Sequence, residues 1–166
     1  MDAHPLLARI ARMLEEHGLE AVLIGNAAAA LQGAPVSTVD LDFMFRKTPA
    51  NLRKLRALAT DLEAVIMRPY YPASGLFRIV RDNDGLQIDF MATVHGVRSL
   101  ASLRSRAQKV TLDGAQLLVA DLSDIIKSKR ATGRPKDTAA LNILEKTLHE
   151  KTRDQKRKTG SSEERE

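Results

Sequence analysis

The 166-residue sequence contains no cysteine and no long hydrophobic run. The absence of cysteine excludes disulfide bonds, thiolate metal ligands and a thiol nucleophile, so a structural zinc site is not expected. No apolar stretch approaches the roughly 20 residues that a membrane-spanning helix needs. The first residues include an acid, Asp2, where a secretory leader would carry bases, so we expect a soluble cytoplasmic protein with no membrane partner.

Hydrophobic residues make up 43% of the sequence, which is enough for the core of one compact domain. The formal net charge of +5 at pH 7 favours polyanionic partners such as nucleotides, RNA or DNA. Part of this positive charge lies in residues 151–166, which contain almost no apolar side chain. We expect this segment to be a fraying helix end that passes into disorder.

Hydrophobic periodicity and turn residues divide the chain into helices and strands. Helical spacing predicts helices over residues 6–17, 27–32 and 49–63. Apolar runs predict strands over residues 20–24, 38–45, 76–81 and 86–92, and a hairpin turn at residues 82–85 joins the last two. After residue 99 the pattern is mostly helical, with a short strand or turn at residues 110–114, and Pro135 separates two of these helices.

Two acidic residues interrupt one of the predicted strands. Asp40 and Asp42 stand two positions apart in TVDLDFMF, residues 38–45, although aspartate is depleted from strands. Residues two apart in a strand project from the same face, with Cα atoms roughly 6 to 7 Å apart. Asp89 lies in a second apolar strand, and a neighbouring strand could bring it onto the same face.

Three carboxylates on one face have the chemistry of a hard-cation site. Oxygen ligands with retained waters suit magnesium. Three acids could hold two metal ions, about 3.5 to 4 Å apart, that activate an attacking oxygen and neutralise a leaving phosphate. The pattern therefore indicates phosphoryl transfer. For an isolated pair of aspartates, a simpler explanation is that Asp40 is a turn residue and that Asp42 pairs with an arginine at a solvated edge. The functional interpretation becomes more specific because of the residues that precede the pair.

Gly25 ends the first predicted strand and is followed by a short predicted helix. Exposed backbone N–H groups and the positive end of that helix could receive a phosphate there. A tight strand-to-helix turn is the structural alternative for this glycine.

Residues 22–42, VLIGNAAAALQGAPVSTVDLD, resemble the signature of the polymerase-beta-like nucleotidyltransferase superfamily. That signature is a strand, a Gly-Gly or Gly-Ser turn, a short helix and Asp-x-Asp on the next strand. The spacing suits the branch of abortive-infection and toxin–antitoxin nucleotidyltransferases. Residues 122–137, LSDIIKSKRATGRPKD, resemble the lysine-plus-RPKD segment of the same branch.

The resemblance implies an α+β nucleotidyltransferase fold, with a mixed, mostly antiparallel sheet packed by helices and followed by a C-terminal helical segment. In this organisation residues 1–97 would be the catalytic core. Residues 98–150 would complete the site as a mostly helical segment, and residues 151–166 would be a disordered charged tail.

The resemblance also implies roles for individual residues. Asp40, Asp42 and Asp89 would be the catalytic carboxylates and the ligands of magnesium, as two ions, with manganese as an alternative. The nucleotide-binding residues would be Gly25, Asn26, Thr38, Lys129 and Arg134, and Asp137 would tie the helices together. Two positions depart from the family pattern, since Asn26 replaces a second glycine or serine and Val36 replaces an arginine.

The implied reaction is transfer of a nucleoside monophosphate from an NTP, such as ATP, to a hydroxyl group with release of pyrophosphate. The acceptor would be a tRNA 3′ end or a protein, and the chain would be a toxin neutralised by an antitoxin partner. A second hypothesis is adenylylation of an aminoglycoside or lincosamide antibiotic, which the basic C-terminal half disfavours. A third is a non-catalytic module that binds nucleotide or RNA, against which the retained carboxylates argue. The four histidines receive no catalytic role.

Overall fold

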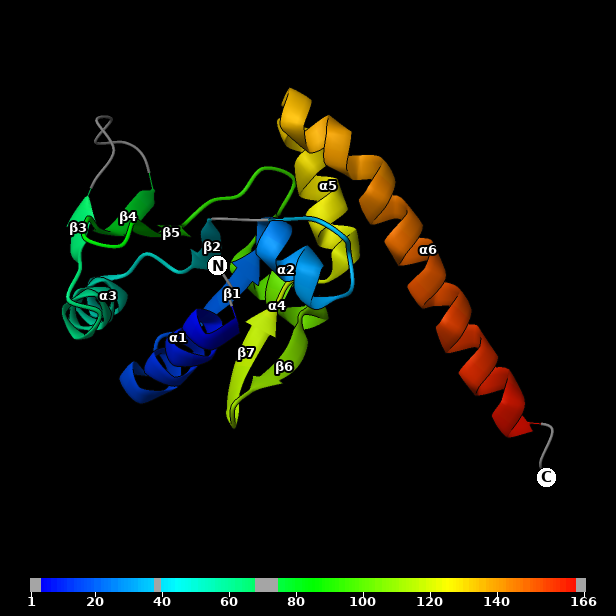
Figure 1. Cartoon of the computed structure of the whole chain (residues 1–166), viewed down its shortest axis with the longest axis horizontal. Coiled ribbons are helices and arrows are strands. Elements are labelled where there is room, and N and C mark those ends of the chain that lie inside the picture. Colours follow the sequence, from blue (N-terminus) through cyan, green and yellow to red (C-terminus); the bar gives the residue numbers. More distant parts are fainter. Residues whose placement is uncertain (1–3, 38–39, 68–74, 164–166) are drawn as a thin grey trace.

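The computed structural model describes residues 4–37, 40–67 and 75–163, with side chains up to residue 160. Its helices are α1 (His4–His17), α2 (Gly25–Leu31), α3 (Pro49–Asp61), α4 (Leu100–Arg106), α5 (Leu122–Thr132) and α6 (Pro135–Glu163). Its strands are β1 (Ala21–Ile24), β2 (Leu41–Phe45), β3 (Val65–Met67), β4 (Leu76–Arg81), β5 (Leu86–Met91), β6 (Gln108–Leu112) and β7 (Ala115–Val119). Figure 1 shows their arrangement.

Within these residues the strands form a single sheet in the order β3-β4-β5-β2-β1-β7-β6. The β2–β5 and β1–β7 pairs are parallel, and the four other pairs are antiparallel. This confirms the predicted α+β fold with a mixed, mostly antiparallel sheet. The helical interpretation of residues 115–119 is wrong, because this short apolar run is β7, which pairs with β6 and β1. The sequence did not predict β3, because three residues are too few to show the alternation of a strand.

Local signals explain where the helices begin and end. Pro49 opens α3 after Thr48, whose hydroxyl oxygen accepts a hydrogen bond from the Asn51 backbone N–H at 3.1 Å. The carboxylate of Asp121 caps α5 by accepting from the Ser123 N–H at 3.1 Å. The same helix ends at Gly133, whose φ of +64° is the left-handed conformation that stops a helix. The RPKD segment then starts α6.

Strand alternation separates the core from the site. Leu41, Phe43 and Phe45 of β2 are buried, while Asp42 between them projects from the opposite face of the strand. Phe43 stacks on Phe90 of the neighbouring strand with ring centroids 5.1 Å apart. The aromatic packing beneath the sheet therefore holds β2 against β5, and the register of their acidic residues depends on that contact.

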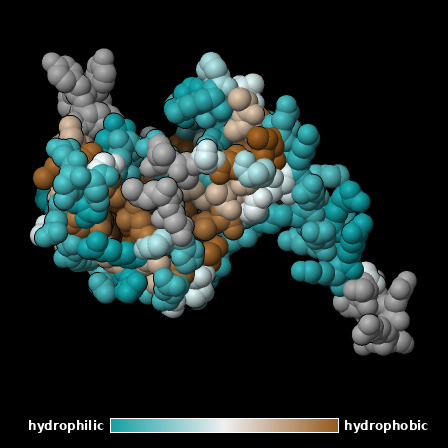
Figure 2. Space-filling model, in the orientation of Figure 1, coloured by the Kyte–Doolittle hydropathy of each residue, from teal (hydrophilic) through white to brown (hydrophobic). Residues whose placement is uncertain are grey.

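Helix α6 continues past the body of the protein, as Figure 1 shows. Residues 152–160 are exposed, and Figure 2 shows the projecting part as hydrophilic. The composition of residues 151–166 predicts fraying into disorder, whereas the structure continues as helix to Glu163. Where α6 leaves the body, the Lys151 ammonium donates to the Gln32 side-chain oxygen at 3.2 Å. Among the helices described, none is long and apolar enough to cross a membrane.

Candidate active site

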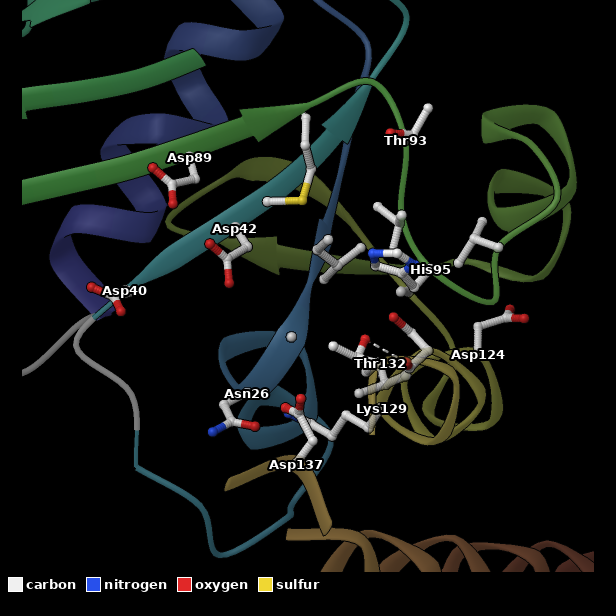
Figure 3. A pocket seen from close by; sticks show the side chains of 18 of the residues that line it. Asn26, Asp40, Asp42, Asp89, Thr93, His95, Asp124, Lys129, Thr132 and Asp137 are labelled. Atoms are coloured by element: carbon white, nitrogen blue, oxygen red, sulfur yellow. Dashed lines mark hydrogen bonds and ion pairs between the residues drawn. The ribbon is translucent and has the colours of Figure 1, made fainter. Parts of the chain in front are cut away.

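A pocket of about 610 Å³ lies between the sheet, helix α2 and the α5–α6 junction. Asp40, Asp42 and Asp89 line one side of it, as Figure 3 shows. Lys129, Arg134 and Lys136, from the end of α5 and the start of α6, line the pocket from another side. Carboxylates and ammonium or guanidinium groups thus share one cavity.

The structure brings together the three carboxylates that the sequence singled out. Asp42 and Asp89 are directly paired neighbours on the parallel strands β2 and β5, so their side chains leave the same face of the sheet. Asp40 stands just before β2, two positions from Asp42, and also lines the pocket. Because β2 and β5 are distant in the chain, this convergence depends on the sheet order.

The pKa of Asp42 is raised to about 6. Burial is the main cause, and the negative charges of Asp89 and Asp40 add to it, while Lys136 and Arg134 act in the opposite direction. Burial and the two neighbouring carboxylates therefore disfavour the ionised form of Asp42 more than the nearby cations favour it.

Arg78 is a site residue that the sequence reasoning missed. It lies on β4 directly opposite Asp89, and its Nε and Nη2 donate to Oδ1 and Oδ2 of that carboxylate at 2.9 and 3.0 Å. Only 9% of the Asp89 side chain is exposed, against 41% of the Arg78 side chain. The predicted hairpin could have revealed this pair. Strand pairing that starts at the turn of residues 82–85 places residue 78 opposite residue 89.

The carboxylates of the pocket are oxygen donors of the kind that a hard cation prefers. Among the residues described here, no group of three or more His, Asp or Glu side chains could hold a metal ion. Arg78 donates to both oxygens of Asp89, so the charge of this carboxylate is already partly neutralised. The carboxylates of Asp40 and Asp42 supply oxygen ligands of the kind magnesium prefers, and a cation there would favour the ionised form of Asp42.

The glycine turn packs against this cluster. Gly25 has a φ of +70°, and a Cβ added to it would lie 3.2 Å from Oδ2 of Asp42. The next residue, Asn26, lines the pocket and donates weakly from Nδ2 to the Ser37 carbonyl at 3.5 Å. Its Oδ1 is buried without a hydrogen-bond partner among the described atoms. Val36 packs against the core, and Thr38 lies outside the described residues.

Asp137 joins the two helices on the basic side of the pocket. Its carboxylate is buried and accepts from Arg134 Nε at 2.7 Å and from Lys129 Nζ at 3.4 Å. Burial alone would raise the pKa of Asp137, but the hydrogen bond from Arg134 and the charge of Lys129 hold it below the usual range. Lys136 also lines this side of the pocket, so three cations accompany the one carboxylate of Asp137 there.

The segment between β5 and α4 forms the remaining wall. His95, to which the sequence assigned no role, lines the pocket with Thr93, as Figure 3 shows. Gly96 packs closely on α5, since a Cβ there would lie 2.8 Å from the Lys127 carbonyl oxygen. A larger residue at this position would separate the wall from α5.

Fold and site together define a nucleotidyltransferase: a mixed sheet carries paired aspartates beside a glycine turn, facing a basic helix junction. The chain belongs to the family described as "Nucleotidyl transferase of unknown function (DUF2204)", whose model matches residues 4–162. No curated protein was found to match the chain.

Solved structures with the same fold include two enzymes that act on antibiotics. ANT(2″)-Ia, in complex with adenylyl-2″-tobramycin, is 16% identical, with 96% of this chain and 97% of that chain covered and a TM-score of 0.62. The lincosamide antibiotic adenylyltransferase LnuA, bound to lincomycin, is 10% identical, with 84% and 94% covered and a TM-score of 0.60. An antigenic nucleotidyltransferase-like protein from Paracoccidioides brasiliensis is 13% identical, with 87% and 74% covered and a TM-score of 0.57.

Proposed function

We propose that the protein transfers a nucleoside monophosphate from an NTP to a hydroxyl acceptor and releases pyrophosphate. The observation that carries this proposal is the in-register pair Asp42 and Asp89 in a pocket that also holds the cations of the α5–α6 junction. A triphosphate needs both features, because its oxygens bind cations and a divalent ion must itself be held by carboxylates.

The carboxylates of Asp40 and Asp42 would hold magnesium, with manganese as an alternative. When bound, the ion would supply positive charge that neutralises the phosphate oxygens during transfer. The acceptor oxygen forms a bond to the α-phosphorus while the bond between that phosphorus and the pyrophosphate oxygen breaks. The hydroxyl proton is released to solvent. The neighbouring carboxylates of Asp89 and Asp40, which add to the effect of burial on the pKa of Asp42, support a cation at this position.

The triphosphate would lie between the glycine turn and the basic side of the pocket. Gly25 has no side chain to block a phosphate, and rotation of the Asn26 amide would replace its unpaired oxygen with an N–H donor. Lys129 and Arg134 would contribute positive charge while Asp137 keeps them in place. Thr38 remains a predicted nucleotide contact.

An RNA 3′ end, such as that of tRNA, is the acceptor that we favour, with a protein hydroxyl as the alternative. The exposed bases of α6 lie beyond the basic side of the pocket and suit a polyanion. A cationic aminoglycoside fits this side poorly. Antibiotic adenylylation is nevertheless the second candidate, because enzymes with this reaction share the fold over nearly the whole chain.

Labelling with α-³²P NTPs and magnesium tests the proposal. Each of the four NTPs is incubated with the protein and with bulk tRNA, a protein lysate, tobramycin or lincomycin. We expect label in tRNA from the wild type and from Asp82→Ala, which removes an exposed aspartate of the β4–β5 turn. Asp40→Ala should label nothing. Absence of wild-type product in every pool would end the proposal, and label in an antibiotic would select the second candidate.

A toxin role with an antitoxin partner is part of the proposal for tRNA. Expression of the wild type alone should then arrest growth, and Asp40→Ala should abolish the arrest without lowering the amount of soluble protein. For a non-catalytic module, calorimetry would show NTP binding that is independent of magnesium and of Asp42.

A further inference from the structure

We infer that the guanidinium of Arg78 takes the place of the second metal ion at this site, so that the chain binds a single divalent cation, at Asp40 and Asp42. This inference rests on the proposed function, since it names the cations of the same site. It makes Arg78 a positioning residue that neutralises Asp89 permanently.

The geometry of the pair carries the inference. Two parallel N–H···O bonds of 2.9 and 3.0 Å occupy both oxygens of Asp89. Such bidentate, charge-assisted pairs are among the strongest polar contacts in proteins. The pair neutralises the charge of Asp89 and so weakens the attraction of this carboxylate for a metal ion.

The fold holds Arg78 in this position. β4 and β5 pair over six successive residues on either side of a tight turn, and Arg78 and Asp89 are direct partners in that ladder. A slip by one residue would turn Arg78 to the opposite face, where the apolar side chains of β4 are buried. The register is therefore fixed by the core and not by the ion pair.

The charge balance agrees with the geometry. Asp89 is nearly inaccessible to solvent, and a buried carboxylate without a partner is strongly unfavourable. Arg78 supplies that partner, and its charge also acts on Asp40 and Asp42. A metal ion at Asp89 would therefore stand beside a fixed cation in the same pocket, which disfavours its binding by like-charge repulsion.

Titration with Mn²⁺, followed by the electron paramagnetic resonance signal of the free ion, tests the inference on the full chain without nucleotide. We expect one bound ion per chain in the wild type and two in Arg78→Met, which keeps an aliphatic side chain but removes the charge. Arg81→Met is the matched control. Arg81 ends the same strand, β4, and forms the same kind of bidentate pair with Asp84 of the following turn, outside the pocket. This control should keep one ion.

Asp89→Asn provides a second variant in case Arg78→Met does not fold, as judged by circular dichroism. We expect it to retain one ion, because Asp89 holds no metal in the wild type. Two ions or none in the wild type, one ion in folded Arg78→Met, or no ion in folded Asp89→Asn would each overturn the inference. Two ions with intact nucleotide transfer would refute only the inference, whereas one ion without any labelled product would refute only the proposed function.

Discussion

A β-carbon on Gly25 would lie 3.2 Å from Oδ2 of Asp42, closer than an ordinary contact. The backbone of the β1–α2 turn thus packs directly against the carboxylate that stands at the centre of the acidic cluster. A side chain at this position would push Asp42 away, so the turn and the cluster form one structural unit.

Gly25→Ala should therefore damage the site more than it damages the fold. The left-handed φ of +70° costs alanine about 1 to 2 kcal/mol of stability. Gly85→Ala is the matched control, since Gly85 has a φ of +71° and nothing within 4 Å of an added Cβ. Urea unfolding should show similar losses for both variants, while Mn²⁺ affinity should fall only in Gly25→Ala. Equal Mn²⁺ affinity in the two variants would contradict the contact with Asp42.

Asp42→Asn should stabilise the metal-free protein at alkaline pH. The pKa of Asp42 is about 6 in the folded state, above the roughly 3.9 of an unfolded aspartate, so the folded state binds the proton more tightly. Stability contributed by that proton is present below about pH 4 and is lost as pH rises through 6. Asp42→Asn has no carboxyl group to ionise at this position, so it avoids this loss of stability.

Urea unfolding in EDTA at pH 4.5 and pH 8 measures the effect. The stability of Asp42→Asn relative to wild type should increase between these pH values by roughly 1 to 2 kcal/mol. An unchanged difference would show that Asp42 ionises normally. For the same reason, Mn²⁺ should bind the wild type more weakly below about pH 6, because the ion then competes with a proton.

Asp137→Asn should destabilise the α5–α6 junction by about 2 to 4 kcal/mol at pH 7, because Lys129 would keep a largely buried charge without its counter-ion. The pKa of Asp137 is held low, so its contribution is present above about pH 4 and is lost as the pH falls below its unfolded pKa. Glu145→Gln is the control, since it removes an exposed pair with Arg130 between the same helices and should cost less than about 1 kcal/mol. Similar losses in both variants at pH 7 would argue against the buried bridge.

Gly96→Ala should open the pocket wall formed by the segment between β5 and α4. The added carbon would lie 2.8 Å from the Lys127 carbonyl oxygen and 3.0 Å from Ala131 Cβ, and the backbone of α5 cannot yield cheaply. We expect a greater loss of stability than in Gly85→Ala, together with a higher KM for the NTP. A loss of stability equal to that of Gly85→Ala would mean that the wall and α5 separate without cost.

Much of the site was accessible from local sequence. The alternation of β2 predicted that Asp42 faces away from the buried Leu41 and Phe43, and Gly25 was recognised at the strand-to-helix turn. The hairpin register also implied that Arg78 faces Asp89, although the sequence reasoning did not use it. These features depend on residues close in the chain, whose geometry follows from strand periodicity and turn length.

Only the tertiary structure decided that Asp42 and Asp89 are neighbours. Their strands are parallel and separated by α3, β3 and β4, so no turn sets the register. The burial of Phe43 against Phe90 sets it instead, through a contact between distant segments. The sequence by itself determined which face each carboxylate occupies and that Arg78 faces Asp89, because strand periodicity and hairpin pairing are local. The sheet order determined which carboxylates meet, because it depends on how the whole core packs.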